Sequence, residues 1–586
     1  MRVQHWFVTV ICLLAFSTSM AASAERPVSG SGEVYSPFQR LVLEAFPETG
    51  KPAPHFVAIL NNGTEALLAR VALIRSARRA IVFQTYIWGE DELSAVIFRE
   101  MLGAARRGVD VRIVIDQVGV KGKGVRQAMA AVAHPNLKIR IYNPTFNELR
   151  TSPRELLRAI LFKFREFDRR MHNKVLVIDE EMAITGGRNI ENEYFDMDPH
   201  YTYKDRDVLV IGRVVPKMAK AVTEYWDFER SLPLERLEDI RPQLDAGVQY
   251  QPAAELELSP LYPYIQEIDR KAADRAFLEG TLIASMMPVR GAVEFYCDAP
   301  LKQASDSGRP VESTLSGLHR IVTSARESIV IQTPYLVFTG RGIRNLAKAR
   351  EKAPDLRIQA CSNSFAAADV IPVYAVAQKQ RKALLARLGF DLHDFKPFPG
   401  DRARMMPRYG DLVKENALAR GVAPPPAGDP QAKGPVMALH CKSLVIDDRV
   451  AWIGSHNFDP RSTQINTEAA LAVHDEAVAR ALKADILRDM APQNSWAVAK
   501  EQRWPVIGAL NECMMSLSNA SPLLDLWPAL YATSYERNEG AAPVAPGDPE
   551  FHKRYRDVGP FPEASVVKRA RLRVAKAIGG WTLSLL

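Results

Sequence analysis

The sequence predicts an α/β fold in which one structural plan is used twice. Strand-like runs begin at Ala80 and at Ile329, and both contain the pair Gln-Thr and a Tyr. A helical pattern precedes each run, and a further helix and a second β-branched run follow it. Each half also carries one copy of a polar motif built on His and Lys. Strands and helices that alternate in a repeated order are typical of α/β layers.

The periodicity of apolar residues places the elements of both halves in order. The expected elements are a helix at 66–77 and strands at 80–88 and 111–115 in the first half, then a helix at 315–325 and strands at 329–337 and 356–358 in the second. Residues 252–274 are expected to join the halves. The duplication ends near Ala497, so residues 498–586 are expected to form an accessory region.

The second half is longer than the first between the shared Gln and the polar motif. The separation is 88 residues from Gln84 to His172 (172 − 84) and 108 from Gln332 to His440 (440 − 332). Residues 402–435 contain three consecutive prolines and a Gly-Asp-Pro sequence, which do not continue a helix or a strand. We therefore predict a long surface loop over 402–435.

The polar motif has the same spacing in both halves. The first copy is His172-Asn173-Lys174 with Asp179, and the second is His440-Cys441-Lys442 with Asp447. A Gly-rich turn begins seven residues after each Asp, at 186–189 and at 454–457 (186 − 179 and 454 − 447). With only 11 His in 586 residues, two trios with matching turns do not arise by chance, so we expect both copies to be used together.

Residues that alternate along an extended segment share one face, so His172 points the same way as Lys174. His440 and Lys442 have the same relation, and the two pairs together suit a phosphodiester. One imidazole can attack phosphorus while the other donates a proton to the leaving alcohol. The four groups expected to neutralise the phosphate oxygens are Lys174, Lys442, Asn189 and Asn457. No metal is required, and no carboxylate cluster or Cys/His spacing suggests one.

A nucleophilic His needs a partner on its other ring nitrogen. In the second half the candidate is Glu468, which lies 28 residues after His440 (468 − 440). Its counterpart in the first half is Asp205, and Asp207 is a close alternative. We expect Asp179 and Asp447 to be structural, because they follow the motif strands at the end away from the histidines.

Composition and the N-terminus bear on partners and location. A formal charge of +8 and a pI near 9.1 favour phosphate-bearing partners, either anionic lipid or nucleic acid. Residues 1–24 resemble a cleavable signal peptide, with Arg2, an apolar run at 6–16 and Ala22-Ser23-Ala24; an uncleaved anchor is the alternative. We expect an exported protein, in the periplasm or on the periplasmic face of a membrane. Its cysteines lack disulfide or zinc spacing, which predicts buried free thiols.

The two motifs and their turns resemble the phospholipase D superfamily, whose signature is H-x-K-x4-D followed by G-[GS]-x-N. The resemblance covers most of residues 66–473. The sequences around 169–174, 186–195, 362–369 and 454–468 are similar to those of the bacterial cardiolipin synthase type C branch. This resemblance implies two pseudo-twofold-related α/β/α sandwich lobes, at 25–260 and 261–497, with one active site between them. It also implies a phosphohistidine intermediate. The symmetry of the two motifs leaves open whether His172 or His440 forms it, and the resemblance favours His172. No cofactor is expected.

The branch resemblance implies transfer of a phosphatidyl group between phospholipids to make cardiolipin, with phosphatidylglycerol and also phosphatidylethanolamine as candidate substrates. A phospholipase D that releases phosphatidic acid is the alternative, because water and alcohols compete for one intermediate. An exported nuclease and a binding protein with an inactive pocket are less favoured. The sequence departs from the branch at 364–369 and from residue 498 onward, and both departures affect the choice of acceptor lipid.

Two segments suggest contact with a membrane surface. Residues 157–167, just before His172, are rich in Leu and Phe and suit a lipid-facing mouth, with a buried core helix as the alternative. Residues 566–586 place Lys and Arg on one helical face and apolar residues on the other, as in an interfacial helix. A helix packed on the protein would show the same pattern.

Overall fold

The first lobe is built on a mixed sheet. The computed structural model of the protein describes residues 35–47, 53–122, 129, 134–150, 153–247, 252–302, 309, 311–426, 434–502, 530–569 and 571–572. The first sheet has the strand order β10-β1-β8-β6-β5-β2-β3-β4-β9. Its strands are β1 (His55–Leu60), β2 (Ala80–Thr85), β3 (Asp110–Asp116), β4 (Leu137–Tyr142), β5 (Val175–Ile178), β6 (Met182–Gly186), β8 (Asp207–Gly212), β9 (Ser231–Pro233) and β10 (Met287–Val289).

The second lobe repeats this plan. Its sheet has the order β11-β18-β17-β16-β12-β13-β14-β19-β20-β21. The strands are β11 (Val293–Cys297), β12 (Ser328–Gln332), β13 (Arg357–Asn363), β14 (Phe390–Phe395), β16 (Ser443–Ile446), β17 (Val450–Gly454), β18 (Ala469–His474), β19 (Ser495–Lys500), β20 (Ala532–Arg537) and β21 (Tyr555–Gly559). The order β8-β6-β5-β2-β3-β4 matches β18-β17-β16-β12-β13-β14, and the last three strands of each set are parallel. The predicted duplicated α/β plan is confirmed.

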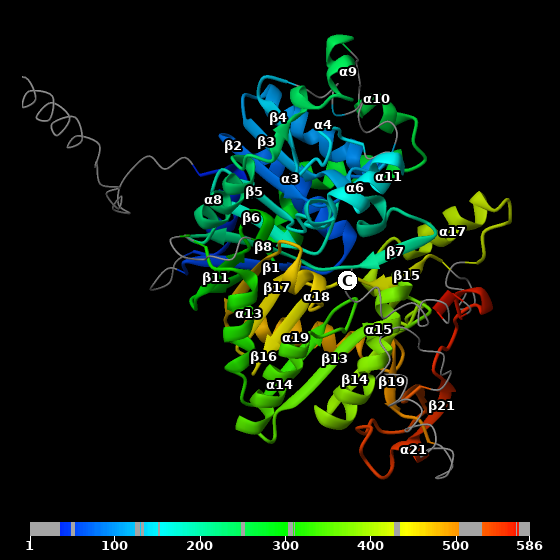
Figure 1. The fold of residues 1–586 in the computed structure, drawn as a ribbon. Helices are drawn as coiled ribbons and strands as arrows, with labels where there is room; N and C mark the ends of the chain where they lie inside the picture. Colours follow the sequence, from blue (N-terminus) through cyan, green and yellow to red (C-terminus); the bar gives the residue numbers. More distant parts are fainter. Residues whose placement is uncertain are drawn as a thin grey trace, which may run out of the picture. The chain divides into compact units, whose positions relative to one another are not determined.

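Helices cover both sheets (Figure 1). Those of the first lobe are α2 (Pro37–Ala45), α3 (Gly63–Ser76), α4 (Glu92–Arg106), α6 (Pro153–Phe162), α7 (Phe164–Asp168), α8 (Val215–Trp226), α9 (Arg241–Asp245), α10 (Pro252–Glu257), α11 (Tyr262–Ala273) and α12 (Arg275–Leu278). Those of the second lobe are α13 (Thr314–Thr323), α14 (Gly340–Lys352), α15 (Ile371–Lys382), α16 (Arg402–Met405), α17 (Tyr409–Ala419), α18 (Pro460–Gln464), α19 (Glu476–Asp489) and α21 (Phe551–Arg554).

The two lobes share one apolar core. Valines on the inner faces of β5, β8, β12 and β16 pack together with apolar residues of α8 and α19. The outer faces of the two sheets pack against separate clusters, which α3 and α4 complete in the first lobe and α13 and α14 in the second. Each sheet is therefore covered on both faces, as expected for strands with nearly continuous apolar sequence.

The hairpins that follow the motif strands are closed by two residues with positive φ. Asp179 and Glu180 have φ of 55° and 58°, and Asp447 and Asp448 have φ of 52° and 56°. Asp tolerates the left-handed region better than most residues, because its short side chain bonds to nearby backbone. The Asp of each motif is thus also the first left-handed residue of a tight turn.

The boundary expected at residues 260/261 was wrong as a limit between the lobes. Helix α11 packs on α3, and β10 pairs with β1, so the first lobe extends to Val289. The segment 252–274, expected to join the halves, instead forms the helices α10 and α11 that cover α4 and α3. Their apolar residues, such as Leu256 and Ile265, are buried in the first-lobe core.

The loop expected over 402–435 was also wrong in part. It contains α16 and α17, whose residues Met405, Tyr409 and Leu412 are buried in the shared core. Their spacing of three to four residues is helical, and the Pro-rich sequence that suggested a loop begins only after α17 has ended. Residues 427–433 lie outside the described part.

The C-terminal region continues the second lobe. Strand β19 pairs with β14, and β20 and β21 extend the sheet beyond it. Of the segment predicted as an interfacial helix, 566–569 are helical and the ammonium of Lys568 donates to the carbonyls of Ala366 and Ala368. Leu572 is buried against the same segment, while 573–586 lie outside the described residues, as do residues 1–24, which the sequence predicts to be a signal peptide. In the described part of the chain, none of the helices has the length and apolar character needed to cross a bilayer.

Candidate active site

The residues just before each motif histidine pair with the backbone of the opposite lobe. The short strand β15 (Val436–Leu439) runs parallel to β7 (Tyr201–Lys204), and the N–H of His440 donates to the carbonyl of Lys204 at 2.8 Å. On the other side Met171 bridges Thr467 in parallel, and the N–H of His172 donates to the carbonyl of Thr467 at 2.9 Å. The residues that follow these carbonyls are Asp205 and Glu468, so both carboxylates lie beside a histidine from the other lobe.

The two histidine–carboxylate pairs cross between the lobes. Nδ1 of His172 lies 2.9 Å from Oε2 of Glu468, and Nδ1 of His440 lies 2.6 Å from Oδ2 of Asp205. The sequence had assigned each carboxylate to the histidine of its own half; that assignment was wrong, although both carboxylates do lie on a motif histidine. A carboxylate only accepts, so each imidazole carries its proton on Nδ1 and presents Nε2 as the basic nitrogen.

The Gly-rich turns hold the two carboxylates in different ways. A Cβ on Gly187 would lie 2.2 Å from Oδ1 of Asp205, so the turn must have Gly at this position. At the equivalent position Ser455 donates its hydroxyl to Oε2 of Glu468. Asp205 also accepts the N–H of Arg206 at 2.7 Å. The signature that reads Gly-Gly in one lobe and Gly-Ser in the other therefore reflects how each carboxylate is fixed.

Asp207, the alternative orienting residue, does not contact a histidine. Its carboxylate pairs with the guanidinium groups of Arg70 and Arg188 at 2.9 and 3.2 Å. Arg188 also donates to the carbonyls of Leu60 and Asp205. This buried network supports the backbone of the first turn, next to the site.

Both lysines fold back toward their own histidines. Lys174 donates to the carbonyl of His172 at 2.7 Å, and Lys442 donates to the carbonyl of His440 at 2.6 Å. The ammonium of Lys442 also lies 2.7 Å from Nδ1 and 3.0 Å from Nε2 of His440. Among the described residues, no side chain bonds to Nε2 of His172. The two halves are thus similar in plan but differ at the reactive nitrogen.

Burial and positive charge set the protonation states. Burial lowers the pKa of Lys174 to about 7, with the charge of Lys442 acting in the same direction and that of Glu468 opposing it. Burial also lowers the pKa of His172 well below its ordinary value, and Lys174, Lys442 and His440 lower it further. Charges from both lobes thus act on one imidazole, as expected for a single shared site.

The second histidine is held differently. Burial and the charge of Lys442 lower the pKa of His440, while the charge of Asp205 acts in the opposite direction. Burial raises the pKa of Asp205, but His440 and Lys442 outweigh this and lower it to about 2. Asp205 therefore stays ionised, and its charge favours the protonated form of His440.

The two turn asparagines are not equivalent. Asn189 is engaged within the protein, because its amide donates to the hydroxyl of Tyr194 at 2.9 Å and its oxygen accepts the N–H of Ile87 at 3.4 Å. The side-chain oxygen of Asn457 is buried and has no partner among the described residues. Its backbone carbonyl accepts the hydroxyl of Thr333 at 2.6 Å. Asn457 is thus the asparagine whose side chain remains available to a ligand.

The motif aspartates bind backbone at the far end of their strands. Each carboxylate accepts three consecutive N–H groups at the start of the central strand of its lobe. Asp179 accepts from Arg78, Arg79 and Ala80, and Asp447 accepts from Arg326, Glu327 and Ser328. These contacts tie each hairpin to β2 or β12 and involve neither histidine.

Sequence reasoning gave no role to a set of tyrosines around the histidines. The ring of Tyr86 lies 5.1 Å from that of His172, and the rings of Tyr194 and Tyr203 lie 5.2 and 4.9 Å from that of His440. The Tyr that follows Gln-Thr in both halves could have indicated that tyrosines lie near the histidines. In the second half this residue is Tyr335, which donates to Asp369 at 2.7 Å.

The segment 362–364 positions the second motif. The side-chain oxygen of Asn363 accepts the N–H of Leu439 at 2.7 Å, and its amide donates to the carbonyl of Leu439 at 2.8 Å. Leu439 immediately precedes His440. Asp369, farther along, accepts from Tyr203 at 3.1 Å and from Tyr335. The segment at which the sequence departs from the branch pattern therefore forms part of the wall beside His440.

An exposed apolar edge leads to the first motif. Leu157, Leu161 and Phe162 of α6 are 59%, 64% and 80% exposed, although such residues are usually buried. Helix α7 follows, and its last residue Asp168 pairs with Arg461 of the second lobe at 2.7 Å. Of the two interpretations of this segment, burial as a core helix is wrong for these three residues.

The cysteines among the described residues are buried free thiols. Cys297 accepts the amide of Asn173 at 3.2 Å, and Cys441 donates to the carbonyl of Lys204 at 3.3 Å. Cys361 is also buried, whereas Cys513 lies outside the described part. Nowhere in the described ranges do three or more His, Cys, Asp or Glu side chains gather as metal ligands would.

Comparison with known proteins gives a family match in both lobes. The family described as "Cardiolipin synthase, PLD-like domain" matches residues 71–224 and 318–490. Cardiolipin synthase C of Escherichia coli (strain K12) is 30% identical over 423 residues, which cover 72% of this chain and 82% of that protein. An uncharacterized protein of Helicobacter pylori (strain J99) is 27% identical over 88% of this chain and 95% of its own. The solved structure of phosphatidylserine synthase from Haemophilus influenzae covers 75% of this chain and 87% of its own, at 15% identity and a TM-score of 0.47.

Proposed function

Because this chain belongs to the cardiolipin synthase family of phospholipase D-like proteins, we propose that it transfers a phosphatidyl group to a phospholipid alcohol and makes cardiolipin. The observation that carries the proposal is the pair of crossed histidine–carboxylate contacts, which supply two basic imidazole nitrogens to one site. Two buried lysines beside them supply positive charge for the phosphate oxygens. The name of the relative from Escherichia coli supports cardiolipin as product.

In the first half-reaction, Nε2 of His172 attacks phosphorus of the donor lipid. A P–N bond forms and the P–O bond to the leaving alcohol breaks, while His440 gives its Nε2 proton to that oxygen. In the second half-reaction, the acceptor hydroxyl gives its proton to His440, its oxygen attacks phosphorus, and the P–N bond breaks. Both steps conserve protons, and His440 ends as it began.

Two observations support His172 as the nucleophile. Burial and the charges of Lys174, Lys442 and His440 lower its pKa well below its ordinary value, so it is held neutral with a lone pair available. In addition, Lys442 already contacts Nε2 of His440, whereas Nε2 of His172 is bonded by no described side chain. A bound phosphodiester would offer Lys442 an anionic oxygen in place of that nitrogen and raise the pKa of His440, which is what a general acid needs.

We propose phosphatidylglycerol as the donor and, as acceptor, a second phosphatidylglycerol or phosphatidylethanolamine. The exposed side chains Leu157, Leu161 and Phe162 would contact the membrane surface beside the site, since their exposure to water is otherwise unfavourable. The segment 1–24 and the membrane-facing edge support export to the periplasm or to the periplasmic face of a membrane.

The product distinguishes transfer from hydrolysis. The purified protein is incubated with vesicles of phosphatidylglycerol, with and without phosphatidylethanolamine, and the lipids are analysed by mass spectrometry. We expect cardiolipin as the product. Comparison of its yield with and without phosphatidylethanolamine identifies the acceptor. Phosphatidic acid alone would instead indicate a phospholipase D. Unchanged lipid together with cleaved DNA in a parallel reaction would refute both lipid activities.

The pKa of Lys174 predicts the alkaline limit of activity. Lys174 binds phosphate only when protonated, and its pKa in the free protein is lowered to about 7. We therefore expect kcat/KM to fall as the pH rises through about 7, because this parameter reports the free enzyme. In Lys174→Arg the charge persists, so the fall should move to higher pH even if the maximum is lower. If kcat/KM fell at the same pH in both proteins, the fall would belong to a group other than Lys174.

A further inference from the structure

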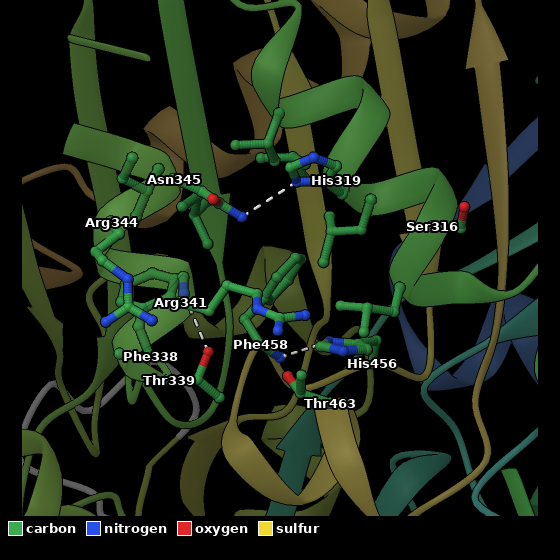
Figure 2. A pocket seen from close by; sticks show the side chains of 18 of the residues that line it. Ser316, His319, Phe338, Thr339, Arg341, Arg344, Asn345, His456, Phe458 and Thr463 are labelled. Carbon is green, nitrogen blue, oxygen red and sulfur yellow. Dashed lines mark hydrogen bonds between the residues drawn. The ribbon is translucent and has the colours of Figure 1, made fainter. Parts of the chain in front are cut away.

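The second lobe contains a large apolar cavity outside the histidine site. It has a volume of about 750 Å³ and lies between α13, α14 and the outer face of β12. Its walls are largely hydrocarbon, from Leu318, Val322, Ile329, Ile331, Phe338 and Leu346. Cavities of this size and composition are typical of small-molecule sites. Figure 2 shows polar side chains, among them His319, Asn345 and His456, placed around it.

The fold itself does not require this cavity. In the first lobe the corresponding helices α3 and α4 pack on each other, and Trp88 packs against Phe98 of α4 in the same buried core, with ring centroids 4.4 Å apart. Helix α4 buries ten of its residues, whereas in α14 only Leu346 and Ala349 are buried. Side chains thus fill the space between the helices and the sheet in the first lobe, whereas in the second lobe part of this space remains open.

One wall of the cavity carries a buried hydrogen-bond donor. His456 is 1% exposed, and its Nδ1 accepts the N–H of Phe458 at 2.9 Å, so its proton lies on Nε2. This Nε2 has no partner among the described residues. The equivalent residue of the first turn, Arg188, is fully bonded to Asp207 and to backbone carbonyls. An unpaired donor in an apolar cavity is unfavourable unless a ligand oxygen accepts from it.

The rim of the cavity is positively charged. Arg341 and Arg344 of α14 line it and are exposed, and neither forms an ion pair with any described residue. Lys348, one turn farther along the same helix, is exposed as well. An apolar interior, a buried donor and a cationic rim together match a ligand with a hydrocarbon chain, an acceptor oxygen and an anionic head.

We propose that this cavity binds one acyl chain of an anionic lipid, as a free fatty acid or a lysophospholipid. The chain lies between α13 and α14. In a lysophospholipid the ester carbonyl accepts from Nε2 of His456 and the arginines at the rim neutralise the phosphate, whereas the carboxylate of a fatty acid lies at the rim beside the arginines. The proposal does not depend on the phosphatidyl transfer proposed above. It adds a second lipid site, on the outer face of the sheet.

The cavity and the candidate active site share one turn. His456 and Phe458 line the cavity, and Asn457 between them belongs to the set expected to bind phosphate. Phe458 has a φ of 59°, a conformation that bulky residues rarely adopt and that is found where the surroundings enforce it. A bound acyl chain would pack against this residue and restrain the turn, so occupancy should change the affinity of the active site for phosphate.

Binding can be measured with ligands that contain no phosphodiester. Full-length protein is titrated, below micelle-forming concentrations, with laurate, palmitate, 1-hexadecanol and 1-palmitoyl-lysophosphatidylglycerol, using displacement of a fluorescent fatty acid. We expect saturable binding that strengthens about fourfold for each added methylene, as hydrocarbon burial predicts. Palmitate should bind more tightly than 1-hexadecanol, and comparison with the lysolipid shows which head is preferred.

Variants assign the binding to this cavity. Leu318→Trp fills it and should weaken palmitate binding by at least about tenfold. Leu487→Trp, on an exposed position of α19, is the matched control and should not. The surface double variant Arg341→Gln/Arg344→Gln keeps the cavity and should remove the preference for palmitate over 1-hexadecanol. Equal binding by Leu318→Trp, no dependence on chain length, or no saturable binding would each overturn the proposal.

Discussion

In His440→Ala, transfer from natural phospholipids should fall by about 10⁴-fold or more, while attack on a phosphatidyl ester of p-nitrophenol continues. The reason is that the two histidines have different tasks in the first step. An alkoxide is a poor leaving group and must be protonated as it departs, which is the task proposed for His440. Nitrophenolate is a stable anion and departs without a proton.

A better leaving group does not remove the need for the nucleophile. In His172→Ala no P–N bond can form, so neither substrate should release its leaving group at more than the background rate. Wild-type protein should release one equivalent of nitrophenolate in a burst and then turn over with an alcohol acceptor. His440→Ala should show the burst without turnover, because no base remains to activate the acceptor.

The measurement is rapid-mixing absorbance of nitrophenolate, combined with denaturation of the labelled protein at neutral to alkaline pH, where a P–N bond survives, and peptide mapping. His552→Ala, which removes an exposed imidazole of α21, is the control and should behave as wild type. A burst in His172→Ala and none in His440→Ala would reverse the two roles. Bursts in both variants would contradict a phosphohistidine at either position.

Local pattern was sufficient for most of the fold and for naming the motif residues that the structure brings together. The nearly continuous apolar runs of β2, β5, β12 and β16 are set by burial on both faces, and they can be read from short stretches of sequence. The spacing from His172 to Asp179 is equally local, because both belong to one strand and its turn. Features of this kind depend on neighbours in the chain.

The crossed carboxylates could not be predicted in the same way. Their pairing follows from two parallel backbone contacts between lobes, Leu439 with Lys204 and Met171 with Thr467. No periodicity within either half encodes which lobe supplies a partner strand. The cavity beside His456 is a further case, because a hollow arises from side chains that are too small or absent, and a sequence displays only those that are present.

Helix content over 402–435 was missed for a different reason. The prolines at 424–426 are strong helix breakers, and their effect was extended to residues that lie well before them. Proline restricts mainly its own position and the one before it, so α17 can end at Ala419 and still pack Tyr409 and Leu412. The proline at 252 likewise does not prevent a helix, because it begins α10.

Because the pairs cross between the lobes, we expect a change in either carboxylate to affect the histidine of the other lobe. In Glu468→Gln the amide can donate to Nδ1 of His172, which moves the imidazole proton to Nε2 and removes the nucleophilic lone pair. Although Glu468 lies in the second lobe, this change should therefore abolish the nitrophenolate burst, with a loss of about 10²- to 10⁴-fold, similar to that seen when the orienting carboxylate of a catalytic triad is neutralised.

Asp205→Asn should act on His440 instead. Its amide also shifts the proton to Nε2, so His440 can no longer accept the proton of the acceptor alcohol. The burst from the nitrophenyl ester should survive, whereas transfer to an alcohol should fall by about 10²- to 10⁴-fold. Glu476→Gln, an exposed carboxylate on α19, is the control, and thermal unfolding checks that all variants are folded.

If each carboxylate served the histidine of its own lobe, the results would be exchanged: Asp205→Asn would lose the burst and Glu468→Gln would keep it. The two variants thus test the pairing itself and not only the importance of the residues. The crossing also implies that neither lobe can do the chemistry alone, since each imidazole takes its tautomer from a carboxylate of the other. A change that separates Leu439 from Lys204 should therefore reduce transfer through His440 and leave the burst at His172 intact.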